Sequence, residues 1–281
     1  MIGQNEFKEL CEWWNDEPKN APALLVLFGR QGMGKKTAVE YIRKTVKNDG
    51  MLKAEDNSVS TVRAVIDKSY QLGGTVYYVF TDCDNMSVQA KNALLKVMEE
   101  PPQGARFIIT AKSSSSVLET VMSRAFVYNM APYSEKELKE FVEQYKKENK
   151  IEGDTPMYSF LSCPGDFVRM FNLPSQGSDL VEYAESIADY IGEVTQANAL
   201  KIATRLDIKG DDPTKYPVDL FFRAVLDKFY RNYKKDKKIS SYFCITAVSN
   251  ALYELSLSTV SKQSVVDSLL IKLRGFMSEE K

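Results

Sequence analysis

A short apolar run next to a glycine-rich loop constrains the fold of this chain more than any other feature. The run ALLVLF (residues 23–28) lies between a proline and a glycine, as expected of a strand buried on both faces of a parallel sheet. The loop GRQGMGKKT (29–37) follows, and the spacing of apolar residues then predicts a helix over residues 35–46. Strand, loop and helix therefore occur in the order of a phosphate-binding loop.

The same alternation of strands and helices continues to residue 130. Apolar runs predict three further strands at residues 73–82, 105–111 and 125–130, and helical patterns predict helices at 5–15, 58–70 and 87–100. Four strands separated by helices predict an α/β fold with a parallel sheet. Beyond residue 130 the strand signals stop, and a capping box at Ser134 and Glu137 starts the first of several helices.

Composition narrows the class of protein. With 281 residues, 44% of them hydrophobic and 27% charged, the chain is expected to be a soluble globular protein of two or three domains. A net charge of −1 gives no overall basic field for nucleic acid, and the lack of histidine excludes imidazole metal sites and Ser-His-Asp triads. Four scattered cysteines favour neither a zinc ribbon nor a disulfide framework. Without a secretory signal or an apolar stretch of about 18 residues, we expect a cytoplasmic protein with no membrane partner.

The loop at residues 29–37 has most of the phosphate-binding pattern GxxxxGK[ST]. Gly29, Gly34 and Lys35 supply its fixed positions, and Gly32 further eases the curl that points backbone N–H groups inward. The lysine would add a charge near the β- and γ-phosphates, so the predicted ligand is ATP or ADP, weakly held. The competing interpretation is a glycine turn that binds nothing.

The last position of that pattern predicts a poor magnesium site. Lys36 replaces the hydroxyl that normally coordinates magnesium, and Thr37 brings a hydroxyl one residue late, about 100° further round the helix. At the end of the second predicted strand, Thr81 stands where a metal-binding carboxylate is expected and Asp82 where a catalytic one is. The candidate nucleotide contacts are therefore Lys36, Thr37 and Asp82, and they are expected to bind magnesium only weakly. The alternative is that Asp82 and the nearby Asp84 are solvated carboxylates.

Several motifs together resemble the clamp-loader branch of the AAA+ proteins. They are NALLKVMEEPP (92–102), FIITAKSSSSVLETVMSR (107–124), GQNE (3–6) and VSTVRAVI (59–66). The bacterial type, with the gamma, tau and delta-prime subunits of DNA polymerase III, fits best, and the resemblance covers residues 1 to about 175. It implies a RecA-like AAA+ domain (1–130), a small helical lid (131–175) and a helical collar (176–281) that holds an oligomer together.

The resemblance also implies roles for single residues. Arg124 stands where the family's SRC motif places an arginine finger, which acts in trans on the nucleotide of a neighbouring subunit, and Ala125 replaces the cysteine of that motif. The competing interpretation of Arg124 is a surface ion pair. Lys112 or Ser113 falls at the sensor 1 position, and Arg169 is the candidate for the phosphate-contacting arginine of the lid.

The chain combines residues that bind magnesium poorly with an arginine at the finger position. In this combination it resembles the delta-prime subunit, which does not hydrolyse ATP itself. The implied partners are other clamp-loader subunits, in a pentamer, together with a sliding clamp and primer-template DNA. The interval 47–60 contains no cysteine, so the zinc module usual in the bacterial family is not expected, as would suit a bacteriophage or a reduced genome. Two alternatives stay open: an active ATPase of the gamma type, and an interaction protein outside any clamp loader.

Overall fold

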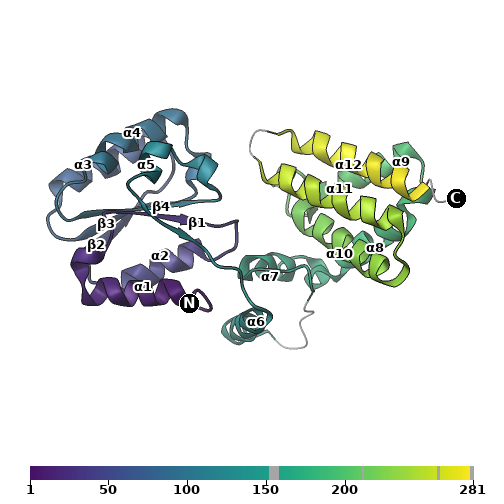
Figure 1. Ribbon diagram of the computed structural model, residues 1–281, viewed down its shortest axis with the longest axis horizontal. Coiled ribbons are helices and arrows are strands. Elements are labelled where there is room, and N and C mark those ends of the chain that lie inside the picture. Colours follow the sequence, from purple (N-terminus) through teal and green to yellow (C-terminus); the bar gives the residue numbers. More distant parts are fainter. Residues whose placement is uncertain (152–157, 211, 258–259, 279–281) are drawn as a thin grey trace. The chain divides into compact units, whose positions relative to one another are not determined.

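The computed structural model of the protein describes residues 1–151, 158–210, 212–257 and 260–278. It divides into two compact units. Unit 1 is Met1–Glu152 with Cys163–Gly165, and unit 2 is Gly153–Ser162 with Asp166–Lys281. Unit 1 contains a parallel sheet covered by helices, and unit 2 is mainly helical (Figure 1). The three-part division implied by the family resemblance is finer than this one and stays a prediction.

The sheet of unit 1 has five strands in the order β2-β3-β4-β1-β5. In chain order the strands are β1 (Leu24–Phe28), β2 (Gly50–Lys53), β3 (Val76–Phe80), β4 (Ala105–Ala111) and β5 (Phe126–Asn129). Every neighbouring pair runs in parallel, and β1 lies between β4 and β5. The predicted α/β fold with a parallel sheet is therefore confirmed.

Helices cover both faces of this sheet. They are α1 (Asn5–Asp16), α2 (Lys35–Thr45), α3 (Val59–Gln71), α4 (Val88–Glu99) and α5 (Glu119–Met122). Helices α1 and α2 pack on one face, and α3, α4 and α5 pack on the other (Figure 1). Because all five residues of β1 are buried, its sequence reads as a continuous apolar run rather than an alternating one.

The side chains of β1 contribute to two separate cores. Leu24, Val26 and Phe28 belong to the cluster under α3, α4 and α5, while Leu25 and Leu27 belong to the cluster under α1 and α2. This division follows from the two-residue period of a strand, which sends neighbouring side chains to opposite faces. The strand that carries the glycine-rich loop is thus fixed from both sides.

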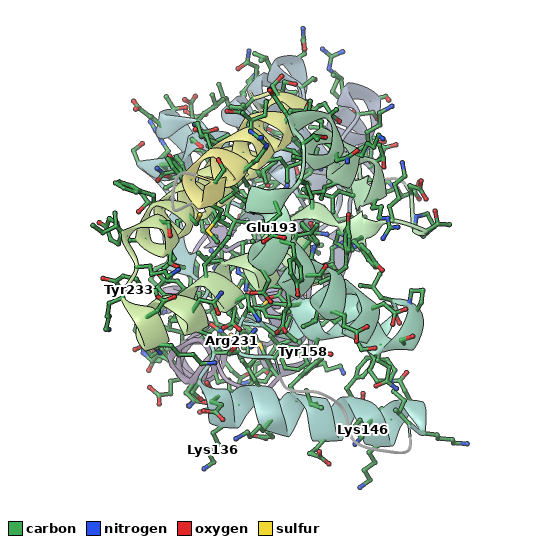
Figure 2. All side chains as sticks on the ribbon, turned by 90° about the vertical axis from the view of Figure 1, so that its right-hand side faces the viewer. Lys136, Lys146, Tyr158, Glu193, Arg231 and Tyr233 are labelled. Atoms are coloured by element: carbon green, nitrogen blue, oxygen red, sulfur yellow. The ribbon has the colours of Figure 1, made fainter. Side chains whose placement is uncertain are left out.

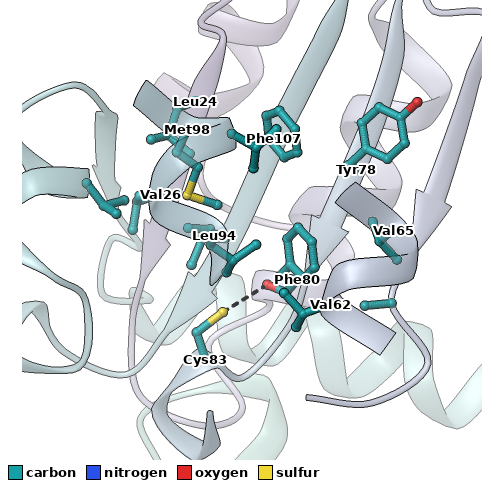
Figure 3. Packing of buried hydrophobic residues seen from close by; sticks show 14 of the residues in the cluster. Leu24, Val26, Val62, Val65, Tyr78, Phe80, Cys83, Leu94, Met98 and Phe107 are labelled. Atoms are coloured by element: carbon teal, nitrogen blue, oxygen red, sulfur yellow. Dashed lines mark hydrogen bonds between the residues drawn. The ribbon is translucent and has the colours of Figure 1, made fainter. Parts of the chain in front are cut away.

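The core under α3 and α4 surrounds the end of β3. Figure 3 shows Phe80 close to Leu94 of α4 and Val62 of α3, with the thiol of Cys83 hydrogen-bonded to the carbonyl of Phe80 at 3.6 Å. Burial, reinforced by the nearby Asp84 carboxylate, raises the pKa of the Cys83 thiol to about 12. Cys83 is therefore a packed, protonated thiol at the base of the turn that carries Asp82 and Asp84.

Strand β2 was not predicted, so the expected count of four strands in this part of the chain is wrong. Its sequence GMLK has no apolar run, and none of its residues is fully buried. It lies at the edge of the sheet and pairs with β3 alone, with Gly50 opposite Val76. An edge strand whose side chains are only partly buried leaves a weak hydropathy signal, which explains why the sequence did not predict it.

Helix α6 (Glu135–Asn149) begins with the predicted capping box. The Ser134 hydroxyl accepts a hydrogen bond from the Glu137 N–H at 3.3 Å, and the Glu137 carboxylate accepts one from the Ser134 N–H at 2.8 Å. The two bonds satisfy N–H groups that a helix start leaves without partners. Lys136 and Lys146 extend outward from this helix (Figure 2).

Unit 2 is built mainly from helices. They are α8 (Ser178–Tyr190), α9 (Gln196–Lys201), α10 (Val218–Asp236), α11 (Ile239–Ser256) and α12 (Lys262–Ser278), together with α7 (Pro164–Phe171) from Asp166 onward. Helices α10, α11 and α12 lie side by side, and α8 packs against α10 (Figure 1). A two-residue ladder, β6 (Leu206–Asp207) with β7 (Tyr216–Pro217), corrects the expectation that strands stop at residue 130. Within the described ranges, no helix is both long and apolar enough to cross a bilayer.

Candidate functional site

The glycine-rich loop joins the end of β1 to the start of α2. Gly32 and Gly34 have φ angles of 85° and 89°, in the region that favours glycine, and Gly34 is the residue that precedes the first turn of α2. The chain therefore makes a tight turn between β1 and α2, and residues other than glycine would be strained at these two positions. The loop lies at the edge of the sheet where the parallel strands end, which is the usual ligand edge of such a sheet.

The lysine of the loop is folded against the loop backbone. Lys35 is only 7% exposed, and its ammonium donates hydrogen bonds to the carbonyl of Gly29 and, at 3.2 Å, to that of Arg30. Burial lowers the pKa of Lys35, and the carboxylates of Asp82 and Asp84 oppose this shift. The carboxylates of the turn after β3 therefore act electrostatically on the loop lysine.

Lys36 and Asp82 form an ion pair across the site. The Lys36 Nζ lies 3.5 Å from the Asp82 Oδ2, and both side chains are substantially exposed, at 68% and 40%. Asp82 adopts a left-handed backbone with φ of 54°, which aspartate tolerates, and its N–H donates to the Thr110 hydroxyl at 3.0 Å. The carboxylate that stands at the expected catalytic position therefore has an ammonium of its own chain beside it.

Asp84 has a structural role at the same edge. Its carboxylate accepts two hydrogen bonds from the Lys112 N–H, at 2.9 and 3.0 Å, and one from the Ser116 hydroxyl. These bonds tie the turn after β3 to the turn after β4. The alternative interpretation of Asp84 as a freely solvated carboxylate is therefore wrong, and the sensor 1 candidate Lys112 meets Asp84 through its backbone N–H.

Thr110, whose role was not predicted, is the polar residue that fixes the position of Asp82. Thr110 is fully buried near the end of β4, and its hydroxyl accepts the hydrogen bond from the Asp82 N–H. A hydroxyl inside the apolar run FIITA is the only sequence signal for this role. Because a buried hydroxyl needs a partner, such a threonine marks a point where two strand ends are joined.

A magnesium ion does not fit the side chains at this edge. The hydroxyl position holds Lys36, the carboxylate position holds Thr81, and Asp82 already lies beside an ammonium. Magnesium requires oxygen ligands in near-octahedral order, and it is repelled by a fixed positive charge. The part of the chain that the structure describes contains no group of three or more acidic, cysteine or histidine side chains placed to hold a metal.

A segment distant in the sequence closes over the crest of the loop. The Gly165 N–H donates a hydrogen bond to the Gly32 carbonyl at 3.1 Å, and the Cys163 thiol lies 3.8 Å from the Gln31 carbonyl. Cys163 is fully buried. The loop is thus held from outside by residues 163–165, a contact that no local pattern in the sequence indicates.

Arg124 and the loop lie at opposite ends of the strands. The loop follows the carboxyl end of β1, and Arg124 precedes the amino end of β5. Arg124 lies two residues after the end of α5, and β5 starts two residues later, so Arg124 stands where the strands begin while the loop stands where β1 ends. The four residues of β5 alone span about 13 Å. Arg124 therefore cannot act on the loop of its own chain.

The side chain of Arg124 is exposed and lightly held. It donates hydrogen bonds to the Thr120 carbonyl at 3.0 Å and to the Ser123 hydroxyl at 3.1 Å. Among the described residues no carboxylate pairs with it, so the alternative of an intrachain surface ion pair does not apply. The guanidinium thus lies at the surface, held by hydrogen bonds to residues within four positions of it in the sequence.

Arg169 belongs to unit 2 and takes part in a charge network there. It donates to both carboxylate oxygens of Asp219, at 2.9 and 2.7 Å, and to Asp166 at 3.1 Å. Arg223 donates to the other oxygen of Asp166 at 3.0 Å. Burial acts to lower the pKa of Arg169, but the hydrogen bond and charge of Asp219 outweigh it and raise that pKa. The role of Arg169 as a phosphate contact stays a prediction.

Comparison with known proteins bears on these residues. Residues 38–134 match the family described as DNA polymerase III, delta subunit. A replication factor C small subunit from Methanosarcina mazei is 27% identical over 146 residues, 47% of this chain and 43% of that protein. A DNA polymerase III subunit delta' from Yersinia pestis is 37% identical over 76 residues, 26% of this chain and 22% of that protein. The similarity to clamp-loader subunits of the AAA+ family is confirmed.

These clamp-loader matches cover only part of each protein. The aligned segments span less than half the length of those two relatives. Residues 38–134 include Asp82 and Arg124, whereas the loop at 29–37 lies just before them. Among solved structures, a point mutant of RuvB from Thermotoga maritima has a TM-score of 0.50 at 15% identity, covering 95% of this chain and 89% of that one. That likeness concerns the fold alone.

Proposed function

We propose that this chain is a clamp-loader subunit of the delta-prime type, which acts in DNA replication beside ATPase subunits. The family match and the two replication relatives support this assignment, as does the parallel α/β fold. Its partners are the other subunits of a pentameric clamp loader, a sliding clamp and primer-template DNA. Its working place is the cytoplasm, where such an assembly meets bacterial or bacteriophage DNA.

The position of Arg124 carries the proposal. Its guanidinium is exposed, has no carboxylate partner among the described residues, and stands at the sheet edge away from its own loop. A guanidinium placed against a γ-phosphate stabilises the charge that develops on the transferred group. Arg124 therefore acts in trans, on the nucleotide of a neighbouring ATPase subunit.

The chain's own loop binds nucleotide without hydrolysing it. Lys36 and Thr81 occupy the two positions that normally hold magnesium, and Asp82 pairs with Lys36. Phosphoryl transfer depends on a metal ion that bridges the β- and γ-phosphates. The loop thus contributes structure and binding, and the neighbouring subunit performs the chemistry.

Helix α11 supplies the surface through which unit 2 joins the oligomer. From Ile239 to Tyr253 it contains no charged residue. Tyr242 and Tyr253 are more than half exposed, at 54% and 67%, and Phe243, whose ring lies beside that of Tyr242, is 48% exposed. An uncharged surface with exposed aromatic side chains is typical of a protein interface. We therefore assign this face of α11 to contacts within the collar.

The experiment is to purify the assembly formed with the ATPase subunit that co-purifies with this chain, and to measure ATP hydrolysis in the presence of primer-template DNA. Arg124→Ala should lower the rate at the neighbouring site by a factor of about 10³ or more. Arg43→Ala, which removes an exposed arginine from the last turn of α2, is the matched control and should leave the rate unchanged. An intact Arg124→Ala assembly with full activity contradicts the proposal.

A further inference from the structure

The residue after the loop lysine places a second ammonium where a phosphate-binding loop normally has a metal. Lys36 is in the first turn of α2, directly after Lys35, and its Nζ lies 3.5 Å from the Asp82 carboxylate. Asp82 is the acidic side chain at the end of β3, on the side of the site where a metal would be bound. Magnesium does not fit this site because the Lys36 ammonium already lies beside the Asp82 carboxylate.

We infer that Lys36 is a built-in counter-cation, so that this loop binds the phosphates of a nucleoside di- or triphosphate without magnesium. In an ordinary loop the metal neutralises the β- and γ-phosphates. Lys35 and Lys36 together supply two positive charges at the start of one helix, whose N–H groups also favour an anion. Magnesium is then unnecessary for binding, and its absence removes the means of hydrolysis.

Asp82 positions the ammonium and does not hold it permanently. Both partners of the ion pair are exposed, and an exposed pair of this kind contributes little stability. The Lys36 side chain can therefore turn from Asp82 to an incoming phosphate. The Asp82 N–H is fixed by the buried Thr110 hydroxyl, so the carboxylate keeps Lys36 near the mouth of the loop.

This inference rests on the proposed function only in taking a nucleotide as the ligand of the loop. It does not involve Arg124, which lies at the opposite edge of the sheet. A measurement on the full chain alone, without partner subunits, therefore tests it separately. If the binding measurement contradicts the role of Lys36, the role of Arg124 is unaffected. If the hydrolysis measurement contradicts the role of Arg124, the role of Lys36 is unaffected.

The test is calorimetric titration of the full chain with ADP and with ATP, in excess magnesium and again in EDTA. We expect the two conditions to give affinities within about twofold of each other, and Lys36→Ala to bind about tenfold more weakly in both. Lys44→Ala, which removes an exposed charge from the same helix away from the loop, should bind like the wild type. Binding that requires magnesium, no binding at all, or a Lys36→Ala chain that binds normally overturns the inference.

A conversion variant keeps the test decisive if Lys36→Ala folds poorly. Lys36→Thr combined with Thr81→Asp restores the hydroxyl and the carboxylate that hold magnesium in a standard loop. This double variant should bind ATP about tenfold more tightly with magnesium than with EDTA. A double variant that stays indifferent to magnesium contradicts the role given to Lys36. Inorganic pyrophosphate should displace ADP from the wild type, and ADP that pyrophosphate cannot displace overturns phosphate recognition.

Discussion

Gly165 packs directly on Gly32, the glycine at the crest of the loop. A Cβ atom placed on Gly165 would lie 2.2 Å from the Gly32 Cα, and one placed on Gly32 would lie 2.8 Å from the Gly165 Cα. Real Cβ atoms do not approach heavy atoms so closely, so both positions require glycine. The loop is therefore held by a backbone contact as well as by its own curl.

This contact predicts that adding one methyl group at Gly165 lowers the stability of the fold. Gly165→Ala should lower the free energy of unfolding by about 1–3 kcal/mol, because the backbone of Gly32 must move to admit it. Gly275→Ala is the matched control, since its Cβ would meet nothing within 4 Å in helix α12. That control should instead stabilise by about 0.5–1 kcal/mol. Urea unfolding followed by circular dichroism measures both, and equal stability of the two variants would refute the contact.

The buried carboxylate of unit 2 predicts a second stability effect. Asp166 is fully buried and pairs with Arg169 and Arg223, at 3.1 and 3.0 Å. Asp166→Ala should destabilise by about 3–5 kcal/mol, because it leaves two partly buried guanidinium groups without their shared partner. Thermal unfolding measures the loss.

The control for Asp166 is an exposed ion pair of similar geometry. Glu40 and Arg43 lie 2.7 Å apart on helix α2, and both side chains are about half exposed. Glu40→Gln should cost less than about 1 kcal/mol. If Asp166→Ala costs no more than this control, the network around Asp166 does not stabilise the fold.

The capping box of α6 predicts a dependence on pH. Hydrogen bonds from the N–H and hydroxyl of Ser134 lower the pKa of Glu137 below its ordinary value of 4.5. Since the folded-state pKa is the lower one, this group's stabilisation is present above pH 4.5 and is lost as pH falls through the folded value. Glu137→Gln keeps an acceptor but no longer titrates. Melting temperatures of the two proteins should therefore converge on acidification, and a constant difference across that window would contradict the assignment.

Strand β1 and its loop were predictable because their signals are local. Strand β1 is buried on both faces, so its apolar run stands out, and the glycines at positions 32 and 34 mark the positive φ angles of the curl. The same holds for the capping box at the start of α6, which needs only two residues three apart. Where the physical cause lies within a few residues, the sequence and the structure agree.

The contacts that complete the site were not predictable in this way. Gly165 reaches Gly32 across more than a hundred residues, and the Thr110 hydroxyl meets the Asp82 N–H from another strand. The sequence indicated that Lys36 weakens a metal site, but only the packing of α2 beside the end of β3 pairs it with Asp82. These relationships arise from the order of strands in the sheet, which hydropathy patterns do not encode.

In the proposed function this chain supplies an arginine finger, and a neighbouring subunit hydrolyses ATP. The most direct measurement compares Lys35→Ala with Arg124→Ala in the same purified assembly, by the rate of ATP hydrolysis with primer-template DNA. We expect Arg124→Ala to lower hydrolysis at the neighbouring site by a factor of about 10³ or more, so that the assembly loses that site's share of the rate, while Lys35→Ala leaves the rate near the wild-type value. Hydrolysis abolished by Lys35→Ala and unaffected by Arg124→Ala would contradict the proposed function and make this chain the active ATPase.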